Sequence, residues 1–201
     1  MPALFQSVLN TWNTSSGGIA SLNHRLIAVI PSGLAKATKM RWMWVDRFTE
    51  FESKKSAKSV KNLSLAEDHF AQHFPGYPVM PVSLMLEGLA QTGGILVGEA
   101  NNFQEKVVLA KIGNAKFTRE AMAGETLIYS TSIVDLRPEG ATIEGKVHVN
   151  GELIGSAEIM FMHLDKARSG AIFGDKNFVF AGDLGNLLGL SRLKNAQTAS
   201  N

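Results

Sequence analysis

The chain has 201 residues, of which 45% are hydrophobic and 19% are charged, and its formal net charge at pH 7 is +2. This length fits one domain, or one domain with tails, and the apolar content is enough for a sizeable core. The near-neutral charge gives no argument for a nucleic acid partner. The lack of cysteine excludes disulfides, thiolate chemistry and cysteine-bound metals. It also suits a reducing compartment, so we expect a cytoplasmic protein.

Residues 1–39 differ in composition from the rest of the chain. No Asp or Glu occurs before Asp46, whereas Ser, Thr, Asn and a few basic residues are frequent. Such a segment is typical of an organellar transit peptide, which leaves an organellar location as the alternative. Because its helical amphipathicity is poor, we favour upstream sequence read from a misplaced start, with the true start at Met40 or Met43. We expect little fixed structure there and place the folded domain at residues 40–165.

The domain begins with a predicted β-hairpin. Residues 41–52 and 59–65 are rich in apolar and β-branched side chains and predict strands, with a polar turn at 53–58 between them. Residues 67–72 predict one helical turn before a proline-rich stretch.

That stretch, residues 73–81, reads HFPGYPVMP. Each proline fixes φ, removes a hydrogen-bond donor and biases its predecessor towards extended geometry, so the stretch is neither helix nor central strand. We expect a rigid loop that holds His73. Its imidazole titrates near neutral pH and is suited to act as a base at pH 7.

Residues 82–98 are apolar on almost every side, with Glu87 as the one charge, which predicts a buried helix. Several glycines weaken this helix by about 1 kcal/mol each relative to alanine, so we expect something to pack very close to it. This stretch is the longest candidate in the chain for a membrane-spanning helix, but its glycines, which weaken a helix, speak against that assignment. A lone carboxylate there must either pair or take up a proton.

The remaining sequence predicts a series of antiparallel strands. Asn150-Gly151 is the strongest hairpin signal in the chain and predicts a type I′ turn. The strands are expected at 107–117, with a possible bulge at Gly113, and at 126–136, 141–149 and 153–163. One long helix with one antiparallel sheet is an α+β arrangement. Residues 166–201 form a tail, in which Asp183 is a candidate N-cap for a short helix at 184–193.

The stretch from His73 to Gln91, HFPGYPVMPVSLMLEGLAQ, resembles the motif of the 3-hydroxyacyl-[acyl-carrier-protein] dehydratases of bacterial-type fatty acid synthesis. Their pattern is H-F-P-G-x-P-x-M-P-G-x-L-x-x-E followed by Ala-Gln. The one clear departure is Val82, where the pattern has glycine. The resemblance covers roughly residues 41–164 and implies the hot-dog fold, a curved antiparallel sheet wrapped around one long buried helix. Glu87, rather than Asp, is typical of the branch that dehydrates without isomerising the product.

The resemblance also implies the chemistry. A 3-hydroxyacyl thioester on an acyl carrier protein would lose water to give the trans-2-enoyl thioester, with no cofactor and no metal. His73 would be the base, and Glu87 would orient or protonate the hydroxyl. The backbone donors for the thioester oxygen would be Gly76, Val82 and Ser83, and the acyl tunnel would be lined by Phe74, Pro81 and Leu84. The family pairs the histidine and the acid across a dimer interface, which implies a homodimer or a trimer of dimers.

Two other residue groups have blander interpretations. His69 and His73 lie one helical turn apart, yet the Phe-Pro-Gly that follows breaks a helix and no third histidine is near, so we expect no metal and place His69 on the surface. A basic cluster in the first hairpin is expected to be a solvated face, with carrier binding there, or at Arg119 or Lys116, as the alternative; its members are Lys54, Lys55, Lys58 and Lys61.

Two rival functions remain open at this stage. An acyl thioesterase on the same fold normally lacks the His-Phe-Pro-Gly loop, so the joint presence of His73 and Glu87 speaks against it. A non-catalytic acyl-binding subunit is the other rival. It would have kept the motif and lost turnover because Val82 adds a β-branched side chain and loses the φ freedom of glycine.

Overall fold

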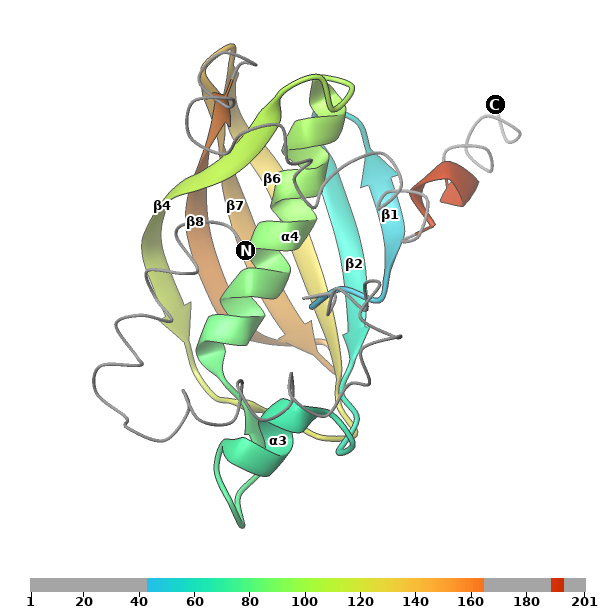
Figure 1. Cartoon of the computed structure of the whole chain (residues 1–201), viewed down its shortest axis with the longest axis vertical. Coiled ribbons are helices and arrows are strands. Elements are labelled where there is room, and N and C mark those ends of the chain that lie inside the picture. The colour runs from blue at the N-terminus through green and yellow to red at the C-terminus, as the bar shows by residue number, and fades with distance from the viewer. Residues whose placement is uncertain (1–42, 165–188, 194–201) are drawn as a thin grey trace, which may run out of the picture. The chain divides into compact units, whose positions relative to one another are not determined.

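The computed structural model describes residues 43–164 and 189–193, and a curved antiparallel sheet wrapped around one helix accounts for most of them (Figure 1). The order of strands in the main sheet is β1 (Arg47–Glu52), β2 (Ser56–Asn62), β6 (Thr126–Arg137), β7 (Gly140–Val149), β8 (Glu152–Leu164) and β4 (Lys106–Phe117). All neighbours are antiparallel. The predicted α+β class and hot-dog architecture are confirmed.

Three short elements flank the long helix and β4 along the chain. The short helix α3 (Asp68–Gln72) leads into β3 (Val79–Met80), which pairs with β5 (Ala121–Met122) in a separate two-stranded sheet. The long helix α4 (Val82–Ala100) follows directly and lies along one face of the main sheet (Figure 1). The predicted rigid loop therefore ends in a β-bridge, which anchors the start of α4.

The close packing predicted around the glycine-rich helix is confirmed. Fourteen residues of α4 are buried, including all of 88–99. At Gly88 the backbone of α4 lies directly against the ring of Tyr129 on β6, and at Gly93 it lies against Ile143 on β7. A side chain at either position would overlap with its neighbour. Glycine lowers the intrinsic stability of the helix, but its lack of a side chain allows the sheet to approach this closely.

We expect Gly88→Ala to destabilise the fold by about 2 kcal/mol or more, because its methyl group would displace the fully buried ring of Tyr129. Gly94→Ala is the matched control in the same helix. Its added Cβ would meet the Phe161 ring at 3.5 Å, an ordinary contact, so the higher helix propensity of alanine should leave stability unchanged or improved. Urea denaturation measures both variants, and equal effects would contradict the packing argument.

Most strand predictions are confirmed, with the main differences in the bounds of the first two strands. The hairpin at Asn150-Gly151 has φ of 51° and 85° at its two residues, as a type I′ turn requires, and β4 carries the bulge expected next to Gly113. The first strand begins at Arg47, and residues 43–46, which were predicted to belong to it, precede it. The second strand, β2, runs from Ser56 to Asn62 instead of over 59–65, so the turn before it is shorter than predicted. The tight turn depends on Lys54, which adopts φ of 61°.

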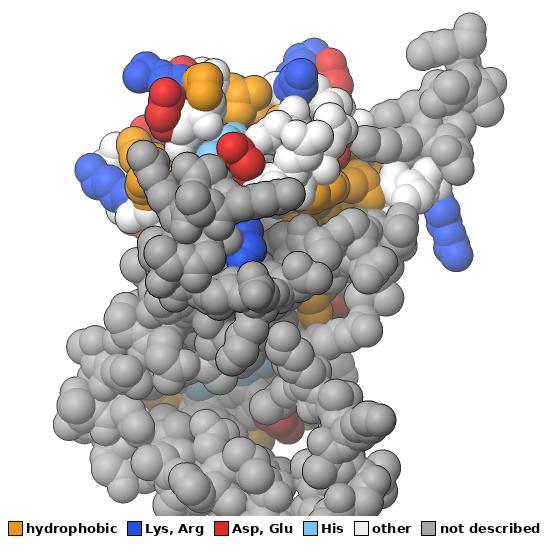
Figure 2. Space-filling view, turned by 45° about the horizontal axis from the view of Figure 1, so that its top comes forward, with side chains coloured by type: hydrophobic (Ala, Val, Ile, Leu, Met, Phe, Trp, Pro, Cys, Tyr) orange, Lys and Arg blue, Asp and Glu red, His pale blue; other side chains and the backbone are white. Residues whose placement is uncertain are grey.

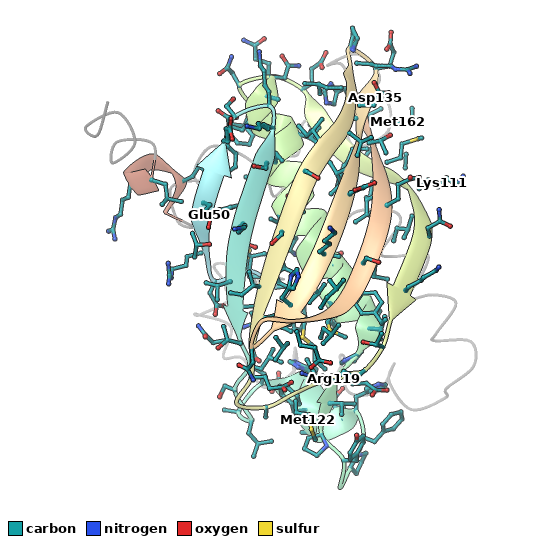
Figure 3. All side chains as sticks on the ribbon, turned by 180° about the vertical axis from the view of Figure 1, so that it is seen from behind. Glu50, Lys111, Arg119, Met122, Asp135 and Met162 are labelled. Carbon is teal, nitrogen blue, oxygen red and sulfur yellow. The ribbon has the colours of Figure 1, made fainter. Side chains whose placement is uncertain are left out.

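The outer face of the sheet and the far end of the domain carry mixed charge. Seen from behind, Glu50, Lys111, Asp135 and Met162 lie on or beside the sheet face turned away from α4 (Figure 3). Figure 2 shows acidic, basic and apolar side chains next to one another on the described part of the upper end. Neither view presents a surface of one sign, in agreement with the near-neutral charge of the chain.

The two ends of the sequence lie largely outside the described residues. The expectations for residues 1–39 and for the cap at Asp183 fall there and stay predictions. Of the predicted short helix, residues 190–193 are described and are helical, and Leu190 is buried in the core of the domain. Within 43–164 and 189–193, no helix is both long and apolar enough to cross a membrane.

Candidate active site

His73 is held by backbone hydrogen bonds on both sides. It is the C-cap of α3, and its N–H donates to the carbonyl of His69 at 3.0 Å. Its own carbonyl accepts the N–H of Val79 at 3.1 Å. The half-buried imidazole stacks on the ring of Phe74, with ring centroids 4.1 Å apart. The main chain, not the side chain, therefore places this histidine, and the imidazole is left available for chemistry.

The loop after His73 closes in a tight turn. Phe74 and Tyr77 exchange two backbone hydrogen bonds, of 2.9 and 3.1 Å, around Pro75 and Gly76. Gly76 has φ of +85°, and proline followed by a glycine with positive φ is the pattern of a type II turn. Gly76 is thus required by the backbone at this position, and the predicted rigid loop is confirmed.

The N-terminus of α4 provides two free donors. Pro81 is the N-cap, and its carbonyl accepts the N–H groups of Leu84 and Met85 at 2.9 and 3.3 Å. Within the described chain, the backbone N–H groups of Val82 and Ser83 donate to no acceptor. They are therefore unpaired donors at the positive end of the helix dipole. An oxygen that develops negative charge is stabilised at such a place.

Val82 fits this helix start without backbone strain. It is the first residue of α4, and it is not among the residues with positive φ. The side chain is half-buried and packs against the core. The glycine of the motif is therefore not needed for backbone conformation here, which removes the main structural reason to expect that turnover is lost.

Glu87 lies in the second turn of α4 and is oriented by Gln91. The Nε2 of Gln91 donates to Oε1 of Glu87 at 2.9 Å, while its Oε1 accepts the N–H of Trp44 at 2.9 Å. Together the two hydrogen bonds fix the side-chain amide of the buried Gln91. The position of this amide in turn orients the carboxyl group of Glu87. Sequence reasoning noted Gln91 only as part of the motif and missed this function; a glutamine one helical turn after the acid was the available signal.

The environment of Glu87 favours its protonated form. Burial in the apolar helix raises the pKa of this carboxyl, against the opposing effect of the hydrogen bond from Gln91. A carboxyl with a raised pKa keeps a larger fraction of protonated acid near neutral pH, as a group that donates a proton to a leaving hydroxyl needs. This effect distinguishes Glu87 from an ordinary surface glutamate.

One chain does not bring all the predicted residues together. Among the described residues, no hydrogen bond or ion pair joins His73 to Glu87. Of the predicted tunnel residues, Phe74 is exposed, Pro81 is half-buried and Leu84 belongs to the core. His73 is held by backbone hydrogen bonds, and Glu87 is held by the hydrogen bond from Gln91.

Two sequence predictions near this site are wrong. His69 is half-buried and does not lie freely on the surface: its ring contacts those of Trp44 and Phe70, at centroid distances of 5.2 and 4.1 Å, and burial lowers its pKa. Lys61 does not belong to a solvated basic face, because only 7% of it is exposed and it forms ion pairs with Asp46 and Glu67. Its inward direction is set by the register of β2, whose other lysine, Lys58, lies on the opposite, exposed side.

Comparison with known proteins supports this description. A family model, the FabA-like domain, matches residues 37–158. The chain is 41% identical over 128 residues to a 3-hydroxyacyl-[acyl-carrier-protein] dehydratase FabZ from Aliarcobacter butzleri, which covers 61% of this chain and 87% of that relative. Identity to the protein of the same name from Campylobacter lari is 38% over 130 residues, 62% of this chain and 89% of the relative.

Solved structures agree on the fold. The dehydratase heterocomplex ApeI:P from Xenorhabdus doucetiae superposes with a TM-score of 0.56 at 12% identity, over 67% of this chain and 91% of that one. The smu.793 protein from Streptococcus mutans, solved with acetyl CoA, has a TM-score of 0.51 at 12% identity, over 65% and 98% of the two chains. The sequence match, the motif around His73 and Glu87 and the hot-dog architecture together place the chain in the FabA-like domain family.

Proposed function

We propose that this protein dehydrates 3-hydroxyacyl thioesters carried on an acyl carrier protein to trans-2-enoyl thioesters, as a step of fatty acid biosynthesis. One observation carries the proposal above the others: Glu87, a carboxyl with a raised pKa, lies one helical turn from two free backbone donors on α4. The names of the FabZ relatives support the same reaction and the same carrier.

Each group has a defined task in this reaction. The imidazole of His73 removes a proton from C2 of the substrate, and the electrons move towards the thioester carbonyl. The carbonyl oxygen, which gains negative charge, accepts hydrogen bonds from the N–H groups of Val82 and Ser83. Glu87 donates its proton to the C3 hydroxyl, the C3–O bond breaks and water leaves. The proton held by His73 is then passed back to Glu87 by way of solvent, and the reverse sequence hydrates an enoyl thioester.

The site is proposed to form between two copies of the chain. Among the described residues no hydrogen bond or ion pair joins His73 to Glu87. Strand β4, at one edge of the sheet, is twelve residues long, and its outer backbone groups have no strand beside them in the described structure. Long open edges tend to pair with another strand, and a two-fold pairing is the commonest case. We propose a homodimer, alone or within a trimer of dimers. The cytoplasmic location stays a prediction.

Mixing two inactive variants tests the shared site. If His73 of one chain works with Glu87 of its partner, a refolded mixture of His73→Ala and Glu87→Gln chains contains hybrid dimers with one intact site each. Random pairing then restores about a quarter of the wild-type activity. No recovery, with hybrid dimers verified by mass spectrometry, would show that the site lies within one chain.

The direct test of the reaction is hydration of a crotonyl thioester, followed as loss of the enoyl absorbance. Wild-type turnover supports the proposal, and the acyl-binding rival predicts binding of the thioester without turnover. Hydrolysis of the thioester, measured as release of free thiol, would instead identify a thioesterase.

Val82 is expected to affect the choice of acyl chain, because it places a branched side chain at the helix start that faces the thioester. We expect Val82→Gly to raise kcat/KM for a ten-carbon enoyl thioester relative to the crotonyl compound by about three- to tenfold, the effect of one or two apolar contacts. Val82→Ala should give an intermediate ratio. An unchanged ratio in both variants would mean that this side chain does not contact the substrate.

A further inference from the structure

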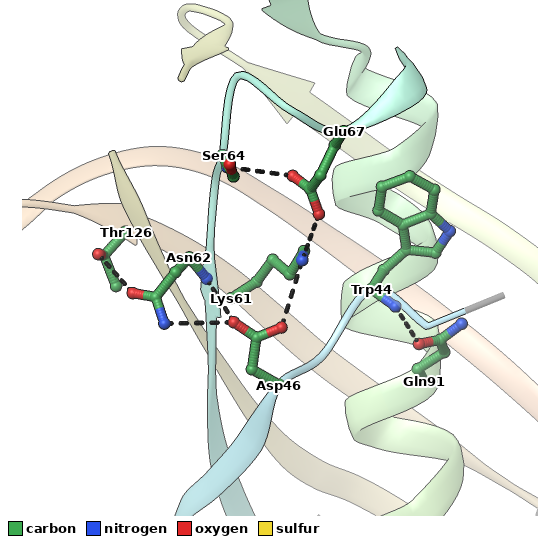
Figure 4. Close-up of polar contacts among 8 residues, drawn as sticks. All are labelled: Trp44, Asp46, Lys61, Asn62, Ser64, Glu67, Gln91 and Thr126. Carbon is green, nitrogen blue, oxygen red and sulfur yellow. Dashed lines mark hydrogen bonds and ion pairs between the residues drawn. The ribbon is translucent and has the colours of Figure 1, made fainter. Parts of the chain in front are cut away.

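The segment just before β1 contacts the supports of both candidate catalytic residues (Figure 4). The N–H of Trp44 donates to Gln91, which contacts Glu87. Two residues further on, the carboxylate of Asp46 accepts from Lys61 at 3.2 Å. The backbone of Asp46 is fixed as well, because its N–H donates to the carbonyl of Val60 at 2.8 Å.

Lys61 joins this segment to α3. Its Nζ lies 2.6 Å from Oε1 of Glu67, the N-cap of α3, and 3.2 Å from Oδ1 of Asp46. Burial by itself would lower the pKa of Lys61, but the hydrogen bond to Glu67 and the charges of both carboxylates outweigh it and raise the pKa. The lysine is therefore charged, inside the protein, between two acids.

The remaining oxygens of both carboxylates also have partners. Oδ2 of Asp46 accepts the backbone N–H and the side-chain Nδ2 of Asn62, at 2.8 and 3.2 Å. Asn62 in turn accepts from the hydroxyl of Thr126 on β6 at 2.9 Å. The second oxygen of Glu67 accepts the N–H of Ser64 at 3.3 Å. The group is thus a satisfied polar network and not an isolated ion pair.

Helix α3 has few other attachments, and it ends at His73. Phe70 is its one buried residue, and His69 packs against the ring of Trp44. A helix of five residues is not stable by itself, so its position depends on tertiary contacts. Among the ion pairs of the described residues, that between Lys61 and Glu67, at the first turn, ties α3 to the main sheet. At the other end, the N–H of His73 donates to the last turn of α3.

We propose that Lys61, held between Asp46 and Glu67, is a positioning residue that fixes the helix carrying His73 against the segment that also supports Glu87. This inference rests on the proposed function. A buried ion pair often adds little stability compared with apolar residues of the same size, so its presence here fits a task of orientation. Loss of Lys61 displaces the base, while the substrate surface made by α4 is unchanged.

The test compares Lys61→Met with Lys58→Met in the full chain. Lys58 lies on the same strand and pairs with Glu50 at 2.9 Å, but on the exposed side, so it is a matched control. For folded Lys61→Met we expect kcat for crotonyl thioester hydration to fall by about ten- to a hundredfold, because a base displaced by about 1 Å loses that much. KM should change by less than about threefold, since the variant alters orientation and not binding. Lys61→Arg should recover most of kcat, and Lys58→Met should behave as wild type.

Hydrogen exchange gives a second readout that does not depend on activity. In Lys61→Met the amides of His73 and Val79 should exchange faster, while those of the buried α4 keep their protection. If this variant does not fold, Glu67→Gln weakens the same contact while it keeps the shape of the side chain. An unchanged kcat together with unchanged exchange at His73, in whichever variant folds, would overturn the proposal. An inactive wild type would count against the proposed function alone, because the exchange experiment still reports on α3.

Discussion

Replacement of His73 by alanine is expected to lower kcat for hydration of a crotonyl thioester by about a thousandfold, the middle of the range for loss of a general base. No other described imidazole lies on the loop before α4, so no neighbour is placed to take over proton transfer at C2. The fold should be retained. The bonds that hold this residue come from its own N–H and carbonyl, to His69 and from Val79, and alanine keeps both.

A histidine outside the site provides the control for this variant. His148 lies on β7, opposite Leu153 of β8, in the main sheet and not in the loop. His148→Ala should keep wild-type turnover, and both variants should give the circular dichroism spectrum and urea midpoint of a folded protein. Residual activity of His73→Ala within tenfold of wild type would remove His73 from the role of base.

The residues of the candidate site can be picked out from the sequence because their signals are local. Proline and glycine fix the loop after His73 through φ alone, and the turn at Phe74–Tyr77 has the conformation that these residues demand. A single acid in an apolar helix is visible in the sequence without any partner. The long helix and the hairpin at Asn150-Gly151 were predictable for the same reason, since periodicity and turn chemistry act over a few residues.

The supports of the site could not be predicted, because they join distant parts of the chain. Trp44 and Gln91 are 47 positions apart, and the residues between them give no indication that one backbone N–H reaches one side chain. The inward direction of Lys61 depends on the twist and register of β2 in the assembled sheet. The bridge between β3 and β5 is two residues long and has no pattern of its own. Such contacts follow from tertiary packing, which overrides local preference.

The arrangement also explains why a polar network lies beneath an apolar helix. The hydroxyls of Ser59 and Thr92 are 2.7 Å apart between β2 and α4, and Thr92 also donates to the carbonyl of Gly88. With Gln91 and Lys61, these contacts define how α4 and α3 lie on the sheet, a task that apolar contacts perform with less directional specificity. The glycine at position 88 then allows the helix to approach the sheet at the turn that carries Glu87.

Glu87→Gln is expected to abolish most turnover and, at neutral pH, to stabilise the fold. Glutamine has the size and the acceptor oxygen of the acid, so Gln91 keeps a partner, but it has no proton to give to the leaving hydroxyl. We expect kcat to fall by about a hundred- to ten-thousandfold. The control is Gln91→Leu, which removes the hydrogen bond to Glu87 but keeps the acid itself. This variant should therefore retain more activity than Glu87→Gln.

The stability effect of Glu87→Gln has a sign that depends on pH. Burial raises the pKa of Glu87 in the folded chain above the value of 4.5 that it has when unfolded. Between these two pKa values the folded state binds the proton more tightly, so the free energy of unfolding of the wild type falls as pH rises through this window. Above the folded pKa the cost of the buried charge is fully present, and the glutamine variant, which never carries that charge, should unfold at a higher urea concentration. Below pH 4.5 the two proteins should be equally stable. Urea midpoints measured from pH 4 to pH 8 test this directly: a variant less stable than wild type at pH 8 would mean that the Glu87 carboxylate is stabilised by a partner in the assembled protein, and the raised pKa on which its role as an acid depends would be wrong.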